Sequence, residues 1–213
     1  METIEFVCFT SACGGTGCSS SAVALARIMT KLHKRKVLVL SLDTMTEKMY
    51  PPSAVKEKPL LDTGLSCGRE QTLKLPLSAD DFGVSYVRDK GFINPFHLIK
   101  ERDLETVLEN ISRSKAYDMV ILDIPYKMPF SEKLITCCEK VVVVSGYLPY
   151  QIKHNGSFLK HLELNIKALK FRPVLYNFTA MEDAESFEGG EVDIHDQFGA
   201  EVRQLADKLY GSA

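Results

Sequence analysis

A glycine-rich turn near the start of the sequence has the residue types and the spacing of a phosphate-binding loop. The apolar run from Ile4 to Thr10 predicts a strand, and the turn after it leads into three serines and an apolar stretch typical of a helix. In a strand, turn and helix of this kind, backbone N–H groups surround phosphate oxygens and the helix N-terminus faces them. The residues that we expect to line the phosphates are Cys13, Gly14, Gly15, Thr16, Gly17, Cys18, Ser19 and Ser20.

This loop departs from the general pattern G-x-x-x-x-G-K-[ST] at two positions. Ala12 replaces the first glycine and Cys18 replaces the lysine, whereas Ser19 keeps the hydroxyl that such loops offer to Mg²⁺. Losing one preorganised stabiliser of developing charge typically costs about 10²–10³ in rate. Binding suffers less, because backbone amides, the helix dipole and Mg²⁺ remain available. The sequence therefore predicts a nucleotide site in which hydrolysis is weak or absent.

Two aspartates follow or end predicted strands. Asp43 comes directly after the apolar run 36–42, and Asp123 ends the run 117–123. Carboxylates at the C-terminal ends of parallel strands gather in one crevice beside a bound ligand. We expect Asp123 to act on the metal side and Asp43 to orient a water or a magnesium-bound water, so that both belong to the catalytic set and, with Ser19, to the metal site. Each aspartate has a simpler interpretation as a cap of the segment that follows it.

The order of elements along the chain alternates strand and helix, which predicts the α/β class. We expect one phosphate-loop NTPase domain over residues 1–213, with a mainly parallel central sheet and helices on both faces. Residues 44–83 are the least regular part, and Leu60, Leu61, Leu65 and Leu73 suggest one or two short helices over the sheet edge. Ser131 is the expected cap of a short helix. The predicted strands are 4–10, 36–42, 83–87, 117–123, 140–145 and 171–176, and the predicted helices are 19–34, 103–114, 131–138, 149–168 and 196–210.

Composition excludes some classes of function. A formal net charge of −2 gives no electrostatic reason to expect nucleic-acid binding. No segment resembles a signal peptide or a membrane-spanning helix, so we expect a cytoplasmic protein without direct membrane insertion. Six cysteines in such a chain favour buried thiols over a disulfide framework.

Taken together, these motifs resemble the deviant Walker A family of ATPases of the MinD/ParA type. The loop K-G-G-x-G-K-[ST] of that family aligns with residues 13–19, where Cys13 and Cys18 stand in place of its two lysines. Its D-x-P motif aligns with Asp123-Ile124-Pro125, and its second aspartate aligns with Asp43. Asn177 falls where the family often carries an asparagine that contacts adenine. The resemblance covers nearly the whole chain.

That resemblance implies ATP and Mg²⁺ as cofactors and a homodimer, ATP-dependent in the leading hypothesis. In the family, the lysine at the position of Cys18 contacts the β- and γ-phosphates. The lysine at the position of Cys13 reaches the nucleotide of the partner subunit. With both charges missing, the implied role is a regulatory or positioning protein that binds ATP and is recognised by a partner protein.

Within that family the loop looks most like that of the TadZ/CpaE-like pilus-localisation proteins. The run from Phe9 to Gly15 is similar to their atypical loop, and the middle segment 83–111 also resembles the corresponding part of these proteins. This branch implies a role in pilus assembly with a partner in the pilus or secretion machinery. Its members usually carry a receiver-like domain before the ATPase domain, for which we expect no room in this chain.

Two alternatives stay open at the level of sequence. One is an active but slow ATPase in which Lys127, just after the D-x-P motif, supplies a substitute charge. The other is an interaction module that retains the fold and has lost nucleotide binding.

Overall fold

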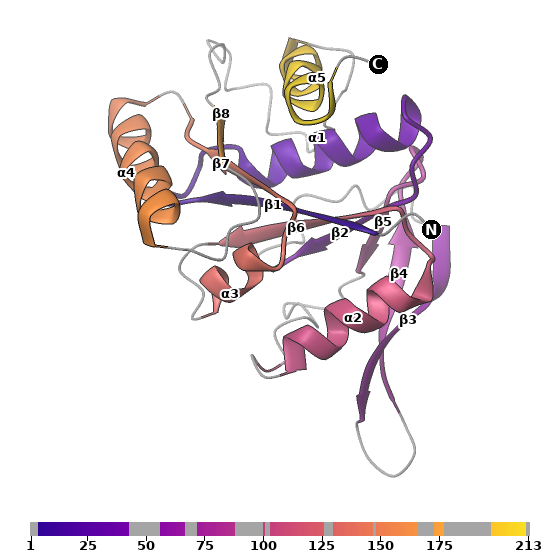
Figure 1. The fold of residues 1–213 in the computed structure, drawn as a ribbon. Coiled ribbons are helices and arrows are strands. Elements are labelled where there is room, and N and C mark those ends of the chain that lie inside the picture. Colours follow the sequence, from indigo (N-terminus) through magenta and orange to yellow (C-terminus); the bar gives the residue numbers. More distant parts are fainter. Residues whose placement is uncertain are drawn as a thin grey trace.

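The computed structural model describes residues 4–42, 56–66, 72–87, 100, 103–125, 130–146, 148–165, 173–176 and 197–211. Its strands are β1 (Glu5–Ser11), β2 (Val37–Ser41), β3 (Lys56–Ser66), β4 (Thr72–Ala79), β5 (Ser85–Val87), β6 (Met119–Pro125), β7 (Lys140–Val144) and β8 (Val174–Tyr176). They form one sheet in the order β3-β4-β5-β2-β6-β1-β7-β8 (Figure 1). The strands from β5 to β8 in this order are parallel, and β3 and β4 add an antiparallel edge.

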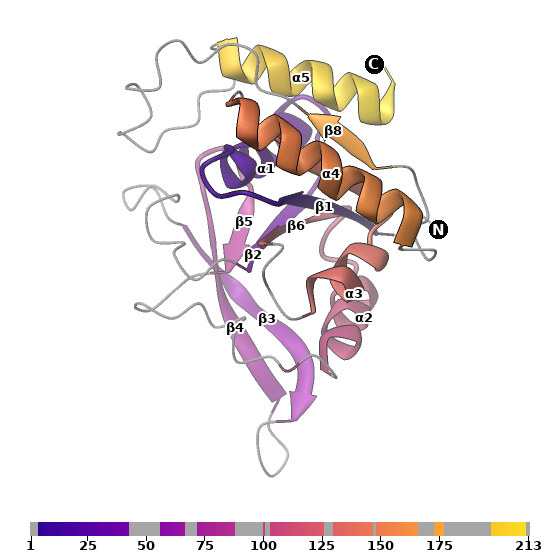
Figure 2. The same cartoon turned by 90° about the vertical axis from the view of Figure 1, so that its left-hand side faces the viewer.

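Helices cover both faces of this sheet. α1 (Cys18–Lys31) and α5 (Gln197–Tyr210) lie on one face, and α2 (Leu104–Ser114), α3 (Ser131–Thr136) and α4 (Pro149–Asn165) lie on the other (Figures 1 and 2). The alternation of side chains along β1 shows how one strand serves both cores. Val7 and Phe9 pack with α1, whereas Phe6 and Cys8 belong to the opposite core. The expected α/β fold with a mainly parallel sheet is confirmed.

The prediction of short helices between residues 44 and 83 is wrong where the structure describes this segment. Residues 56–66 and 72–79 are the two strands of an antiparallel hairpin, which extends the sheet beyond β5 (Figure 2). Leu61 is buried, but Leu60 is 57% exposed and does not pack over the sheet. Burial along this strand alternates with a period of two residues, as in a strand: Leu61 and Thr63 are buried, and Asp62 between them is exposed.

Two prolines in this hairpin are accommodated by an irregularity in the pairing. Lys58 pairs with Leu77 and Leu61 pairs with Leu75, so Pro59 and Leu60 together lie opposite Pro76. Two residues facing one is the arrangement of a β-bulge, which tolerates a residue without an N–H donor. Pro59 and Pro76 therefore lie at a bulge within an otherwise paired hairpin.

A buried ion pair joins α1 to the turn between β4 and β5. Nε of Arg27 donates to Oδ2 of Asp80 over 2.9 Å, and both side chains are almost fully buried. Oδ2 also accepts from the hydroxyl of Tyr86, while Oδ1 accepts the backbone N–H groups of Phe82 and Val84. The carboxylate is thus fully hydrogen-bonded, as a charge removed from water must be. This network fixes the helix whose first turn forms the site described below.

Most predicted elements are present with ends shifted by a few residues. The prediction that Ser131 caps the short helix α3 is wrong. Phe130 is the N-cap of α3, and no side chain caps that helix. Ser131 is already the first helical residue and is buried, so its hydroxyl is not at the cap position.

Candidate functional site

The chain leaves β1 at Ser11 and enters α1 at Cys18 through a tight glycine-rich loop. Gly15 and Gly17 have φ angles of +69° and +74°, and Gly17 is the N-cap of α1. Side chains with a Cβ rarely adopt this conformation, so glycine is required at these two positions. The carbonyl of Gly17 accepts the backbone N–H and the hydroxyl of Ser21, which starts the helix directly behind the loop.

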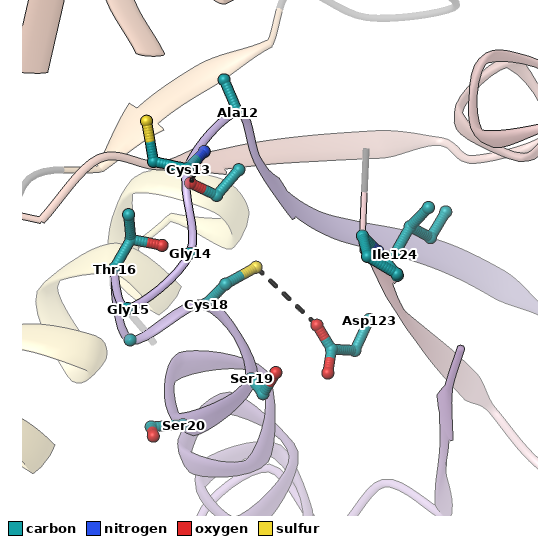
Figure 3. A pocket seen from close by; sticks show the side chains of 13 residues that line it. Ala12, Cys13, Gly14, Gly15, Thr16, Cys18, Ser19, Ser20, Asp123 and Ile124 are labelled. Carbon is teal, nitrogen blue, oxygen red and sulfur yellow. Dashed lines mark hydrogen bonds between the residues drawn. The ribbon is translucent and has the colours of Figure 1, made fainter. Parts of the chain in front are cut away.

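This loop encloses a cavity of about 390 Å³ at the C-terminal edge of the sheet (Figure 3). Loop residues form one wall, and the end of β6 forms the other. Among the described residues that line it, the one charged side chain is Asp123. The lining consists of Ser11, Ala12, Cys13, Gly14, Gly15, Thr16, Gly17, Cys18, Ser19, Ser20, Asp123, Ile124 and Pro125.

Asp123 lies beneath the start of α1 because β6 pairs with both β1 and β2. Its register partners are Phe9 in β1 and Ser41 in β2, and the hydroxyl of Ser41 donates to Oδ2 over 3.2 Å. The thiol of Cys18 donates to Oδ1 over 3.7 Å. Figure 3 shows the Cys18 side chain extending toward this carboxylate, with Ser19 on the same side of the helix turn.

Backbone amides of the loop divide into two groups. Ala12 donates to Oδ1 of Asn155, and Cys13 donates to the hydroxyl of Ser11, so these two N–H groups are engaged. In the described part of the chain, no hydrogen bond engages the backbone N–H groups of Gly14, Gly15, Thr16 or Gly17. Four successive unpaired donors beside a helix N-terminus form the kind of concavity that binds anions.

Two polar side chains from α4 hold the loop from the side opposite β6. Gln151 is 2% exposed, and its Nε2 donates to the carbonyls of Gly14 and Gly15, each over 3.3 Å. Asn155 is fully buried and accepts from the N–H of Ala12 and the hydroxyl of Ser11. We did not predict either residue from the sequence. The available signal was a pair of amide side chains four positions apart, a spacing that puts both on one face of the predicted helix.

A second thiol lies deeper in the sheet below this site. Burial raises the pKa of the Cys8 thiol well above its ordinary value of 9.0, and a hydrogen bond with Cys138 raises this pKa further. Both residues are buried, and the five described cysteines are free thiols. Cys8 therefore stays protonated and serves as a small apolar side chain of the core.

The structure brings most of the predicted site residues together. Residues 13–20 and Asp123 line the same cavity, although the Ser20 side chain points away from the carboxylate in Figure 3. Asp43, Asn177 and Lys127 lie outside the described residues.

No protein-family model and no curated protein matches the chain. Solved structures do match. MinD from Aquifex aeolicus superposes with a TM-score of 0.68 at 15% identity, covering 98% of each chain. A plasmid partition protein from Borrelia burgdorferi B31, bound to AMPPNP, gives 0.63 at 13% identity over 97% of this chain and 98% of that one. A ParA family ATPase from Chlorobium tepidum gives 0.58 at 12% identity, over 100% and 95%.

This chain has the fold of the MinD and ParA proteins. At these identities the likeness concerns the path of the chain and not its chemistry. The MinD/ParA fold accounts for the parallel strands, the loop after β1 and the position of α1. None of the helices in the described part combines the length and the apolar character that crossing a lipid bilayer requires.

Proposed function

We propose that the protein binds ATP with Mg²⁺ through the loop between β1 and α1 and acts as a nucleotide-dependent regulatory or positioning module. The unpaired amides of residues 14–17 are the observation that supports this most directly. They form a donor array of the size that a polyphosphate chain needs, at the positive end of α1. The similar partition protein from Borrelia burgdorferi was solved bound to AMPPNP, which is in keeping with a nucleotide as the ligand proposed here.

Residues around the cavity also fit a hard divalent cation. Asp123 offers a carboxylate and Ser19 a hydroxyl, and Mg²⁺ prefers oxygen ligands of this kind. Within the described residues, no three His, Cys, Asp or Glu side chains gather into a metal site of their own. Mg²⁺ would therefore depend on phosphate oxygens and water for the rest of its shell, so metal and nucleotide should bind together. The metal would offset the repulsion between a triphosphate and Asp123.

We infer that hydrolysis is weak or absent, because the loop carries Cys13 and Cys18 where the deviant Walker A ATPases carry lysines. Each lost charge costs about 10²–10³ in rate when it stabilises developing negative charge. We further propose membership of that family, near its TadZ/CpaE-like branch, an ATP-dependent homodimer and a protein partner in pilus or secretion machinery. The resemblance of the loop residues carries these finer assignments.

Isothermal titration with ATP, ADP and GTP, each with and without Mg²⁺, tests the proposal. We expect ATP to bind with Mg²⁺, and sizing in solution under the same conditions to show a dimer. Replacing Ser19 with alanine should weaken binding about tenfold in the presence of Mg²⁺, the usual size of one lost hydrogen bond or ligand. Ser157→Ala is the matched control, because that serine is exposed on α4 and does not line the cavity. No binding at millimolar ATP and Mg²⁺ would exclude the proposed function.

A further inference from the structure

Gln151 contacts the phosphate loop on the side away from the cavity. The loop continues from β1, whose neighbours in the sheet are β6 on one side and β7 on the other. Asp123 belongs to β6, whereas α4 follows β7 and packs against β7 and β8. Gln151 and the cavity wall formed by β6 thus lie on opposite sides of the loop.

The hydrogen bonds of Gln151 determine how two peptide groups are turned. Its Nε2 donates to the carbonyls of Gly14 and Gly15. In a planar trans peptide the C=O and the following N–H point in opposite directions. A carbonyl directed at α4 therefore directs the next N–H, that of Gly15 or of Thr16, away from α4 and toward the cavity.

The amide of Gln151 has one orientation that satisfies its partners. Oε1 accepts the backbone N–H of Leu148 over 3.3 Å, which leaves the NH₂ group for the two loop carbonyls. Gly146 makes room for this arrangement: its φ is +70°, and a Cβ there would overlap Oε1 of Gln151. Asn155 fixes the start of the same loop through Ala12 and Ser11.

We propose that Gln151 is a positioning residue for phosphate binding, which holds the Gly15 and Thr16 amides toward the ligand in a site whose described lining lacks a cation. This inference rests on the proposed function. It adds to that function a way in which a loop without charged side chains keeps its N–H donors oriented for phosphate binding. Because residues 11–20 of the loop include no lysine to attract the phosphates, binding depends on N–H donors that already point toward the ligand, since reorienting peptide groups on binding would cost free energy.

Gln151→Glu tests this with almost no change of shape. The ionised carboxylate would face two carbonyl oxygens without a donor, and we expect the affinity for ATP with Mg²⁺ to fall about tenfold or more. Burial beside carbonyls raises the pKa of such a carboxyl group, and the protonated form regains an O–H donor. The loss should therefore shrink as the pH is lowered from about 8 to about 5.5, since the folded protein then carries the neutral acid.

Two further variants separate this role from packing and from the pH dependence of ATP itself. Gln151→Met keeps the volume and should lose affinity equally at every pH. Gln204→Glu makes the same exchange at an exposed position of α5 and should behave as the wild type throughout. Thermal melts of each variant show whether the fold persists.

Each outcome decides a different point. A wild type that binds neither ATP nor pyrophosphate with Mg²⁺ overturns the proposed function, and this inference with it. If the wild type binds ATP with Mg²⁺ and the Gln151→Glu variant has the same affinity as the Gln204→Glu variant, the inference about Gln151 is overturned while the proposed function stands. A Gln151→Met variant that binds as tightly as the wild type shows that the packing of Gln151, and not its donated hydrogen bonds, supports the loop, and it overturns the inference as well.

Discussion

The thiol of Cys18 lies 3.7 Å from Oδ1 of Asp123, and this contact joins the first residue of α1 to the carboxylate of β6. A thiol is a weak, neutral donor and does not balance the charge of the carboxylate. Asp123 is 5% exposed and is the one charged side chain among the described residues of the cavity lining. In this contact a buried carboxylate is therefore paired with a neutral thiol.

Introducing a lysine at residue 18 should strengthen nucleotide binding. In Cys18→Lys the new ammonium group would reach both Asp123 and a bound polyphosphate. Hydrogen bonds to charged groups contribute about 1.5–3 kcal/mol, so we expect affinity for ATP to rise about tenfold or more by calorimetry. Cys18→Met is the neutral control of similar length. Equal affinities in the two variants would show that charge at residue 18 is irrelevant to binding.

Removing the carboxylate should affect binding in opposite directions with and without metal. In Asp123→Asn we expect weaker binding of ATP when Mg²⁺ is present, because a metal ligand is lost. With a chelator present we expect stronger binding than in the wild type, by about tenfold, because the repulsion between carboxylate and triphosphate is gone. Asp207→Asn, an exposed exchange on α5, controls for net charge. A change of the same sign in both conditions would contradict this role.

Alkylation of the cysteines should report on the occupancy of the cavity. Cys18 lines it, so ATP with Mg²⁺ should slow the reaction of Cys18 with iodoacetamide, as quantified by peptide mass spectrometry. Cys137 is partly exposed and does not line the cavity, and its rate should not change. Cys8 should remain unmodified near pH 8 in either case, because burial and its raised pKa keep it a protonated, inaccessible thiol. Protection of Cys137 to the same degree would indicate a general change of the fold.

The ion pair between Arg27 and Asp80 should be important for stability. Asp80→Asn leaves the buried guanidinium without its counter-charge, and removing one partner of a buried pair typically costs about 3–5 kcal/mol. We expect the urea midpoint to fall accordingly. Asp81→Asn changes the same residue type at the exposed neighbouring position and should alter stability by less than about 0.5 kcal/mol. Comparable losses in both variants would mean that the network is not the cause.

Sequence reasoning predicted the parallel core well, because its strands are short apolar runs and most of them are followed by a helical pattern. It failed in the described residues 56–66 and 72–79, where the period-two burial around Leu61 is interrupted by a bulge at Pro59. It also identified the loop and Asp123, since their residue types are local signals. Gln151 and Asn155 could not be assigned in this way: their partners lie more than 130 positions earlier in the chain, and only the packing of α4 brings them to the loop.

A phosphate site formed by peptide dipoles attracts an anion over a shorter distance than a site formed by ammonium groups. The field of a dipole falls off more steeply with distance than that of a charge, and a protein with a formal net charge of −2 offers no long-range attraction to an anion. A triphosphate would thus arrive by unguided diffusion and be captured only at contact. Its association rate should respond little to ionic strength, because the attraction acts well within the Debye length of about 8 Å at physiological salt.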